Sequence, residues 1–308
     1  MKKLMTDIPF VQKTDVEYGV CETLSPMIRR VTAPNPGPFT YTGTGVYIIG
    51  HGEVAVIDPG PYDPVHEAAL DAALAGERVT HVFVTHHHLD HSPLAHPLAN
   101  KHAAQVYGFG AQTAPPAGGE VRLEAGDDVG FTPDVEIVDG QEFIGPGWTI
   151  EALHTPGHTS NHVCYALKEE NILFSGDHVM AWSTSVISPP DGHMGDYLRE
   201  LARVRDRNFT RLWPTHGPAV ENPTEFVQAY IDHRLKREQQ ILEHLISCPL
   251  YVPELVAAIY TDVDKRLHPA AAHSILAHMI HLMELGLVQS AGEPGLRNRF
   301  RLSSQARD

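Results

Sequence analysis

Short apolar runs separated by turn residues dominate the first two thirds of the chain. The runs VYIIG and VAVID, with His51-Gly52-Glu53 between them, predict a β-hairpin over residues 46–58. Helical spacing predicts a helix over residues 66–74, and the next apolar run predicts a buried strand over residues 79–85. Further short strands are expected at Val106 and over residues 121–123, 135–138, 149–153, 162–167 and 171–174.

The pattern changes to helical periodicity near Asn222. Residues 224–246 predict a long amphipathic helix. Two shorter helices and two strand-like segments are expected after it, over residues 253–260, 269–285, 287–289 and 298–302. Three helices followed by a small hairpin are the outline of a winged helix. We therefore predict a larger domain of mixed helices and strands in residues 1–222 and a winged-helix-like domain in residues 223–308.

The composition fits a folded protein of this size. The 308 residues are 42% hydrophobic and 20% charged, and the chain is long enough for two hydrophobic cores. No apolar run approaches the roughly 20 residues that cross a bilayer, and the first residues lack the pattern of a secretory signal. The three cysteines, Cys21, Cys164 and Cys248, are too far apart for a CxxC ligand pair and are typical of a reducing compartment. We expect a cytoplasmic protein without a membrane span.

The charge balance limits the partners. Lys and Arg number 23 against 38 Asp and Glu, and the net charge of −15 disfavours nucleic acid and anionic membranes. The helix expected over 269–285 contains no Lys or Arg, which excludes sequence-specific DNA recognition by that helix. Arg297, Arg299 and Arg301 alternate along the last expected strand, where they form either a phosphate-contacting face or a solvated, charge-protected edge strand. A small-molecule substrate is expected, RNA is the alternative, and no oligomeric state is predicted.

Five short polar motifs contain the candidate chemistry. Each follows an apolar strand-like run and lies beside turn residues, where a loop can present a side chain from a rigid edge. The motifs are Asp58 in VIDPG, THHHLDH over residues 85–91, His158 in HTPGHT, Asp177 in SGDH and His216 in PTHGP. We expect them to converge on one site.

Histidine nitrogens and carboxylate oxygens in this arrangement indicate a zinc site. His86 and His88 point to the same side of an extended segment, whereas Asp90 and His91 can face a second metal. The candidate ligands are His86, His88, Asp90, His91, His158, Asp177 and His216. They predict two Zn²⁺ ions that share a hydroxide, with iron or manganese as alternatives for one or both ions.

Residues beside the ligands receive supporting roles. Asp58 and Asp90 are the candidate catalytic residues; Asp58 is expected to orient a ligand imidazole, with a turn before Pro59 as its alternative role. His87, between two ligands, is expected to point away from the metals. His162 and His178 are expected to be structural, with proton transfer or support of a ligand as the alternative.

The motif set resembles that of metallo-β-lactamase-fold hydrolases, in which these five motifs occur in this order. The resemblance implies an α/β fold, an αββα sandwich, with a dinuclear site at one edge. It also implies the division of the ligands between the ions: His86, His88 and His158 on one metal, Asp90, His91 and His216 on the other, and Asp177 as the bridge.

A narrower resemblance is to the β-lactamase-like protein 2 family. It is based on residues 35–50 (NPGPFTYTGTGVYIIG), residues 175–192 (SGDHVMAWSTSVISPPDG) and the winged-helix-like tail. That family includes enzymes that cut single-stranded RNA and hydrolases related to glyoxalase II.

The chain departs from the family pattern at one position. Asn161 in HTSNH stands where relatives often have an acidic residue. The charge around His158 that the family pattern would imply therefore does not carry over to this chain. The resemblance also places Tyr41, Trp182 and Ser185 near the site without assigning them a role.

These observations favour a dinuclear zinc hydrolase in which a metal-bound hydroxide attacks an ester, thioester or amide carbonyl. The chain has no GxSxG motif, so no serine nucleophile elbow competes with this hypothesis. The alternatives are a single-strand endoribonuclease or other phosphodiesterase at the same di-zinc site, a mononuclear iron oxygenase, and a non-catalytic binding protein.

Overall fold

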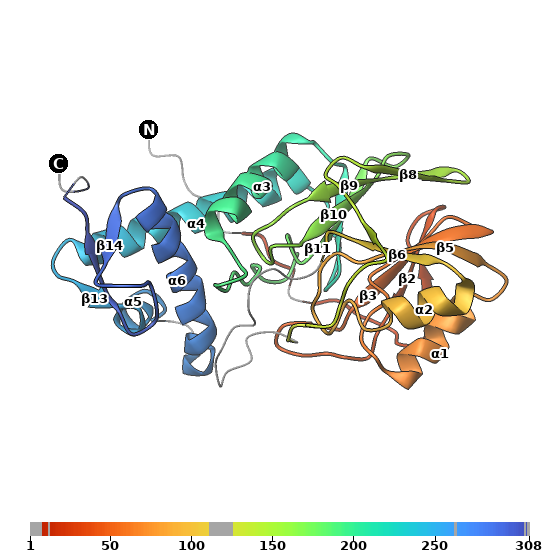
Figure 1. The fold of residues 1–308 in the computed structure, drawn as a ribbon, viewed down its shortest axis with the longest axis horizontal. Coiled ribbons are helices and arrows are strands. Elements are labelled where there is room, and N and C mark those ends of the chain that lie inside the picture. Colours follow the sequence, from red (N-terminus) through yellow and green to blue (C-terminus); the bar gives the residue numbers. More distant parts are fainter. Residues whose placement is uncertain (1–7, 12, 111–125, 262–263, 305, 307–308) are drawn as a thin grey trace.

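Two stacked β-sheets lie between two pairs of helices, and a smaller helical unit follows them (Figure 1). This computed structural model describes residues 8–11, 13–110, 126–261, 264–304 and 306. The four layers confirm the expected αββα sandwich. The strand expected over residues 121–123 lies outside the described residues.

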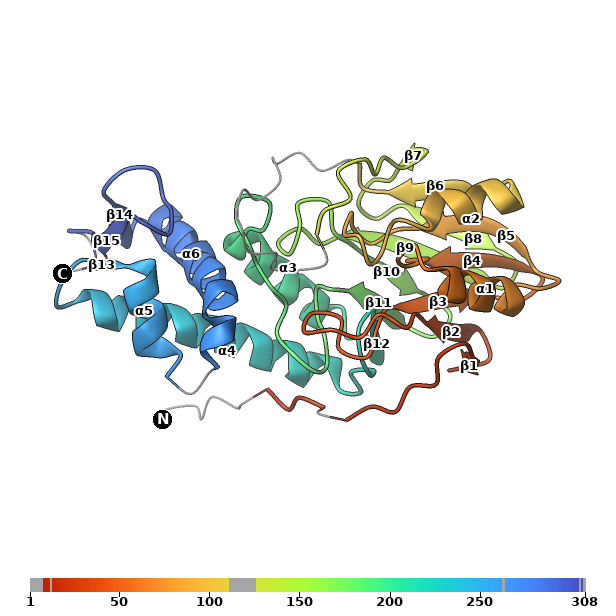
Figure 2. The same ribbon diagram turned by 90° about the horizontal axis from the view of Figure 1, so that it is seen from below.

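The first sheet has the strand order β1-β2-β3-β4-β5-β6-β7. Its strands are β1 (Cys21–Thr23), β2 (Ile28–Thr32), β3 (Gly45–Ile49), β4 (Glu53–Ile57), β5 (Arg78–Phe83), β6 (Gln105–Gly108) and β7 (Val135–Glu136). Neighbouring strands are antiparallel from β1 to β4 and parallel from β4 to β7. The helices α1 (Pro64–Ala73) and α2 (Ala95–His102) cover its outer face (Figure 2).

The second sheet has the order β12-β11-β10-β9-β8. Its strands are β8 (Glu142–Gly145), β9 (Trp148–His154), β10 (Val163–Leu167), β11 (Ile172–Gly176) and β12 (Arg211–Pro214). Only the pair β11 and β12 is parallel. Helices α3 (Met194–Asp206) and α4 (Pro223–Leu245) pack on its outer face, and a core that includes Phe83, Trp148 and Phe174 fills the space between the sheets.

The C-terminal unit is a small winged helix. It contains the second half of α4, α5 (Val252–Ile259), the 3-10 turn Lys265–Leu267, α6 (His268–Glu284), and a sheet of β13 (Leu250–Tyr251), β14 (Val288–Ser290) and β15 (Arg299–Leu302). The strand order is β13-β15-β14. The edge-strand interpretation of the arginine-rich segment is therefore wrong, because β15 pairs on both sides.

Helix α4 belongs to two hydrophobic cores. Phe226 and Tyr230 in its first half pack with the α3 side of the second sheet, whereas Ile241 and Leu245 pack with α5, α6 and the small sheet. The domain boundary at residue 222 stays a prediction, and the continuous helix ties the two units together. Among the described residues, no helix combines the length and the apolar character needed to cross a bilayer.

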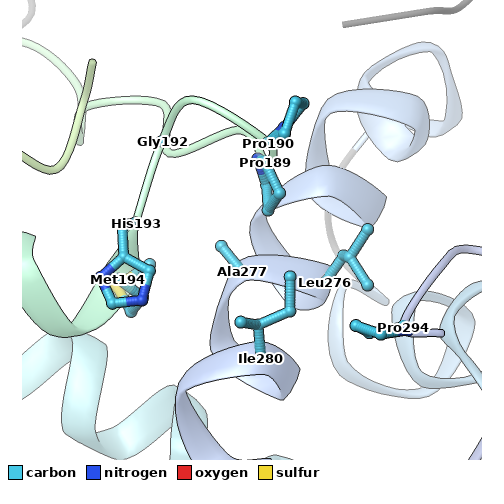
Figure 3. A pocket seen from close by; sticks show the side chains of 9 residues that line it. All are labelled: Pro189, Pro190, Gly192, His193, Met194, Leu276, Ala277, Ile280 and Pro294. Carbon is cyan, nitrogen blue, oxygen red and sulfur yellow. The ribbon is translucent and has the colours of Figure 1, made fainter. Parts of the chain in front are cut away.

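A second contact between the units surrounds an apolar cavity of about 400 Å³ (Figure 3). Leu276 and Ile280 project from α6 toward the Pro189-Pro190 segment. Nearby, His193 at the start of α3 contacts Glu284 at the end of α6 across 2.9 Å. The winged helix is thus held against the loop that follows β11.

The structure differs from the sequence predictions at two helices. No helix was predicted for α2 or α3. The eight residues of α2 include Pro97, which weakens a helical pattern. In α3, however, Tyr197, Leu201 and Val204 are buried at helical spacing, so the signal was present in the sequence.

A buried ion pair links α4 to α6 and gives the first prediction. Burial raises the pKa of Glu238, but hydrogen bonds from His278 and His281 outweigh it and lower this pKa to about 2. Glu238→Gln should reduce the free energy of unfolding at pH 7 by about 3 kcal/mol, measured by urea denaturation. Because this pKa is lowered, the stability that ionised Glu238 contributes to the wild type is lost as the pH falls from 4.5, the ordinary pKa, toward 2.

The matched control for this prediction is Glu243→Gln on an exposed turn of the same helix, where Glu243 contacts Gln239. It should change the stability by less than about 0.5 kcal/mol. Equal losses in the two variants would contradict the role assigned to Glu238.

Candidate metal centre

The five motifs occupy the carboxyl ends of five strands at one edge of the sandwich. Asp58 follows β4, His86 follows β5, and His158, Asp177 and His216 follow β9, β11 and β12. β4 and β5 are parallel, as are β11 and β12, while β9 and β11 run the same way because both are antiparallel to β10. The topology therefore delivers side chains that are up to 158 positions apart in the sequence to one place.

One candidate ligand group consists of His86, His88 and His158. Each offers a nitrogen, and the three nitrogens lie within 4.8 Å of one another. Nε2 of His86 is 2.8 Å from Nδ1 of His88, and the His158 ring lies 4.9 Å from each of the other two rings. The three side chains are almost completely buried.

A second candidate group consists of Asp90, His91 and His216. Oδ2 of Asp90 is 3.1 Å from Nε2 of His216 and 3.6 Å from Nε2 of His91. Asp177 lies between the groups: its Oδ1 is 3.5 Å from His216 and 3.7 Å from His91, and its Oδ2 is 3.9 Å from His158. All seven predicted ligands thus come together.

The donor atoms fit divalent cations. Two ligands of a tetrahedral zinc ion with bonds of about 2.1 Å are about 3.4 Å apart, close to the nitrogen–oxygen separations found here. Nε2 of His91, Nε2 of His216 and Oδ1 of Asp177 are buried and make no hydrogen bond of normal geometry. Such atoms are costly to bury unless another group satisfies them, and a cation would do so.

The opposite nitrogens of the imidazoles are held by the protein. Nδ1 of His91 lies 2.8 Å from Asp58, Nδ1 of His158 lies 2.7 Å from the Val186 carbonyl, and Nδ1 of His216 lies 3.2 Å from the Gly43 carbonyl. These contacts orient the rings, so each Nε2 is directed at the cluster and could bind a cation once it has lost its proton.

Asp58 is completely buried behind the cluster. Besides His91, it accepts hydrogen bonds from the backbone N–H and hydroxyl of Thr85 and from the hydroxyl of Thr215. The structure therefore places Asp58 as an orienting residue and not among the metal-facing atoms, whereas Asp90, the other candidate catalytic residue, lies in the second ligand group.

The neighbouring histidines are part of the support. His87 donates from Nδ1 to the side-chain oxygen of Asn161 over 2.9 Å. His162 accepts the backbone N–H of Asp177 at Nε2. Gly176 permits this approach, because a Cβ there would lie 2.5 Å from that nitrogen. His178 packs against His162 and Tyr197, and burial lowers its pKa to about 3.

The sequence analysis missed three supporting residues. Asp127 lies 3.6 Å from Nε2 of His88 and 3.5 Å from Nε2 of His87. It lies in the acidic segment EAGDD after the strand expected over residues 121–123, and without a histidine beside it this segment was not distinguished from an ordinary turn. Thr85 and Thr215 each precede a candidate ligand histidine. This repeated Thr-His pair is a sequence pattern from which both threonines could have been predicted.

The charges of the cluster favour cations. Burial opposes a charge on His216, but Asp177 and Asp90 outweigh burial and raise its pKa to about 10. Burial likewise opposes a charge on His91, whose pKa is raised well above its ordinary value by Asp90, Asp58 and Asp177. Without a metal, protons on these two imidazoles balance the buried carboxylates, and bound cations would take over that role.

The cluster opens into a cavity of about 440 Å³. His158 and Asp177 line it together with residues of α4 and α6 and with Tyr260, which follows α5. Trp182 and Ser185, expected near the site, lie on its wall, and Tyr41 stacks on Trp182 with ring centroids 5.0 Å apart. The C-terminal unit thus forms part of the candidate active site.

The fold and this cluster define a metal-dependent hydrolase of the metallo-β-lactamase type. The family model of the metallo-beta-lactamase superfamily matches residues 41–216, and that of the beta-lactamase associated winged helix domain matches residues 252–296. The chain belongs to the metallo-beta-lactamase superfamily. Within it, the chain is 32% identical over 275 residues to a beta-lactamase-like protein 2 homolog of Drosophila melanogaster, covering 85% of this chain and 90% of the fly protein.

Two further relatives bear on the fold and the chemistry. An atrochrysone carboxyl ACP thioesterase of Paecilomyces divaricatus is 29% identical over 296 residues, covering 92% of this chain and 88% of that protein. The crystal structure of a beta-lactamase domain protein from Burkholderia ambifaria superposes with a TM-score of 0.76 at 19% identity, over 94% of this chain and 95% of that one. The latter likeness concerns the fold alone.

The position of Asp177 between the ligand groups predicts that its loss affects both. Asp177→Asn keeps the shape but removes the charge, and should lower the metal content per chain, measured by elemental analysis after dialysis. Asp71→Asn, on the exposed surface of α1, is the matched control and should retain the wild-type content. Unchanged metal in Asp177→Asn would contradict its placement as a ligand.

Asp58 gives a separate prediction, because it acts through His91. An amide at this position cannot accept all the hydrogen bonds of the carboxylate, so His91 loses its fixed orientation. Asp58→Asn should weaken metal binding by about 10–100-fold, measured by competition with a chelator. Thr215→Val, which removes only one of these hydrogen bonds, should produce a smaller effect in the same direction.

Proposed function

We propose that the protein is a dinuclear zinc hydrolase that cleaves the thioester, or a related ester or amide bond, of a small acyl substrate. The observation that supports this most directly is the pair of adjacent ligand groups with Asp177 between them at the wall of a cavity. A pair of bound metals would supply a hydroxide nucleophile at neutral pH and polarise the carbonyl under attack.

The protein's own residues orient this chemistry. Asp58 and the Val186 and Gly43 carbonyls fix the three imidazoles, and His162 fixes the backbone of Asp177. The candidate ligand side chains are buried, and two of them, His158 and Asp177, line the cavity. In the reaction, the water oxygen bonds to the acyl carbon, the C–S bond breaks, and the thiol leaves with a proton.

The cavity fits an acyl group. Phe39, Met180 and Trp182 give it apolar walls beside the metal-facing His158. The likeness to a fungal ACP thioesterase over 92% of the chain supports a thioester as the bond cleaved. The net charge of −15 disfavours long RNA, so RNA cleavage is an outcome of the test and not a second proposal.

An activity screen tests the proposal. Zinc-loaded protein should hydrolyse acyl N-acetylcysteamine thioesters, followed by thiol release, and a chelator should abolish the activity until zinc is restored. Asp177→Asn should reduce the rate by about 100-fold or more, because it removes a charge between the metals.

The control reaction uses Asp71→Asn, which should keep the wild-type rate. Cleavage of a single-stranded RNA oligonucleotide with no thioester turnover would replace the proposal with a phosphodiesterase. One iron per chain in protein purified without added metal would favour an oxygenase.

A further inference from the structure

The cavity beside the candidate metal centre is also lined by basic side chains. His233, Arg234 and Arg237 come from one face of α4 and line the same cavity as His158 and Asp177. Among the described residues of this lining, the only acidic one is Asp177, whose carboxylate faces His91 and His216. The described part of α4 that lines the cavity therefore brings positive charge without a carboxylate beside it.

Neither arginine has an acidic partner among the described residues. Arg234 donates to the Ser185 carbonyl and packs 5.3 Å from the Tyr197 ring. Arg237 donates to the Gln240 side chain over 3.1 Å and stacks 4.1 Å from the Tyr260 ring. A buried charge without a counter-charge is costly, so an anion in the cavity would stabilise both guanidinium groups.

Polar atoms of these side chains are also left without hydrogen bonds. Nε of Arg234, Nε of Arg237 and Nδ1 of His233 are all buried with no partner, and the whole Arg234 residue is 3% exposed. Burial lowers the pKa of Arg237, and the nearby Arg234 lowers it further. Burial and the two arginines lower the pKa of His233 to about 3, so its imidazole is neutral and retains one N–H.

We propose that Arg237, with Arg234 and His233, forms a subsite for an oxyanion, a carboxylate or phosphate group located on the substrate away from the bond that is cleaved. Stacking on Tyr260 holds the planar guanidinium of Arg237 and leaves donors of its fork for two oxygens. The proposal rests on the proposed function, because it assumes that the substrate occupies this cavity. It selects acyl substrates with an acidic group over neutral ones.

Direct binding tests the subsite without requiring turnover. Succinate and inorganic phosphate are titrated separately into the zinc-loaded protein by calorimetry, with neutral succinamide as the uncharged probe. Arg237→Gln should weaken binding of the preferred anion at least tenfold, about 1.4 kcal/mol, and leave succinamide unchanged. The stronger of the two anions identifies the source as carboxylate or phosphate.

Lys236→Gln is the matched control, since Lys236 is the adjacent, exposed cation of the same helix. It should bind both anions as the wild type does. Arg237→Lys keeps the charge but loses the fork, and should recover part of the affinity. Equal binding by wild type and Arg237→Gln would overturn the proposal, because the anions would then bind only the metals.

Further measurements distinguish failure of the subsite from failure of the proposed function and from misfolding of the variant. If Arg237→Gln does not fold, Arg237→Lys decides: it should bind the preferred anion less tightly than the wild type and succinamide equally well, and unchanged binding of the anion would overturn the subsite. If thioesters are not cleaved but Arg237→Gln weakens anion binding, the proposed reaction fails and the subsite stands. If thioesters are cleaved and neither the affinity nor the KM for an acidic acyl thioester changes in Arg237→Gln, the subsite fails and the reaction stands.

Discussion

The carboxylate of Asp58 joins the parts of the structure on which the site depends. It lies at the end of β4, accepts two hydrogen bonds from Thr85 at the end of β5, and accepts another from Thr215 beyond β12 of the opposite sheet. Its fourth hydrogen bond is with Nδ1 of the His91 imidazole. One fully buried side chain therefore fixes two strand ends of the first sheet, one of the second, and the orientation of a candidate ligand, so fold and site share a single constraint.

The rest of the centre follows the same physical rule. Three of the candidate ligand imidazoles have one nitrogen tied to an acceptor and the other directed at the cluster, which is the arrangement that metal coordination favours. The acceptors are a carboxylate for His91 and main-chain carbonyls for His158 and His216. Because backbone carbonyls do not depend on residue type, part of this support comes from the path of the loops and leaves no trace in the sequence.

The sequence pattern could predict the winged helix and the convergence of the seven ligand candidates, and the resemblance of the motifs to those of a known family implied the sandwich. Strand-end histidines and aspartates mark positions that parallel topology brings together, and their periodic surroundings identify the strands. The sequence could not reveal Asp127, which reaches His88 from an irregular loop, or the wall formed by Arg234 and Arg237. Those arginines lie on a helix whose sequence is typical of an ordinary amphipathic segment, and their place in the cavity lining depends on how α4 packs in the folded protein. The central position of β15 could not be predicted either, because its neighbour β13 has only two residues, which are too few to give a sequence pattern.

The continuity of α4 has a consequence for how such proteins can be recombined. Arg234 holds the carbonyl of Ser185, and the next carbonyl, that of Val186, holds His158. Helix α4 is thus connected to the candidate ligand His158 through two hydrogen bonds to adjacent carbonyls of one loop. If this winged helix were grafted onto a different hydrolase, it would replace part of the cavity lining and disturb the candidate ligand equivalent to His158. The two units therefore have to be exchanged together and not separately.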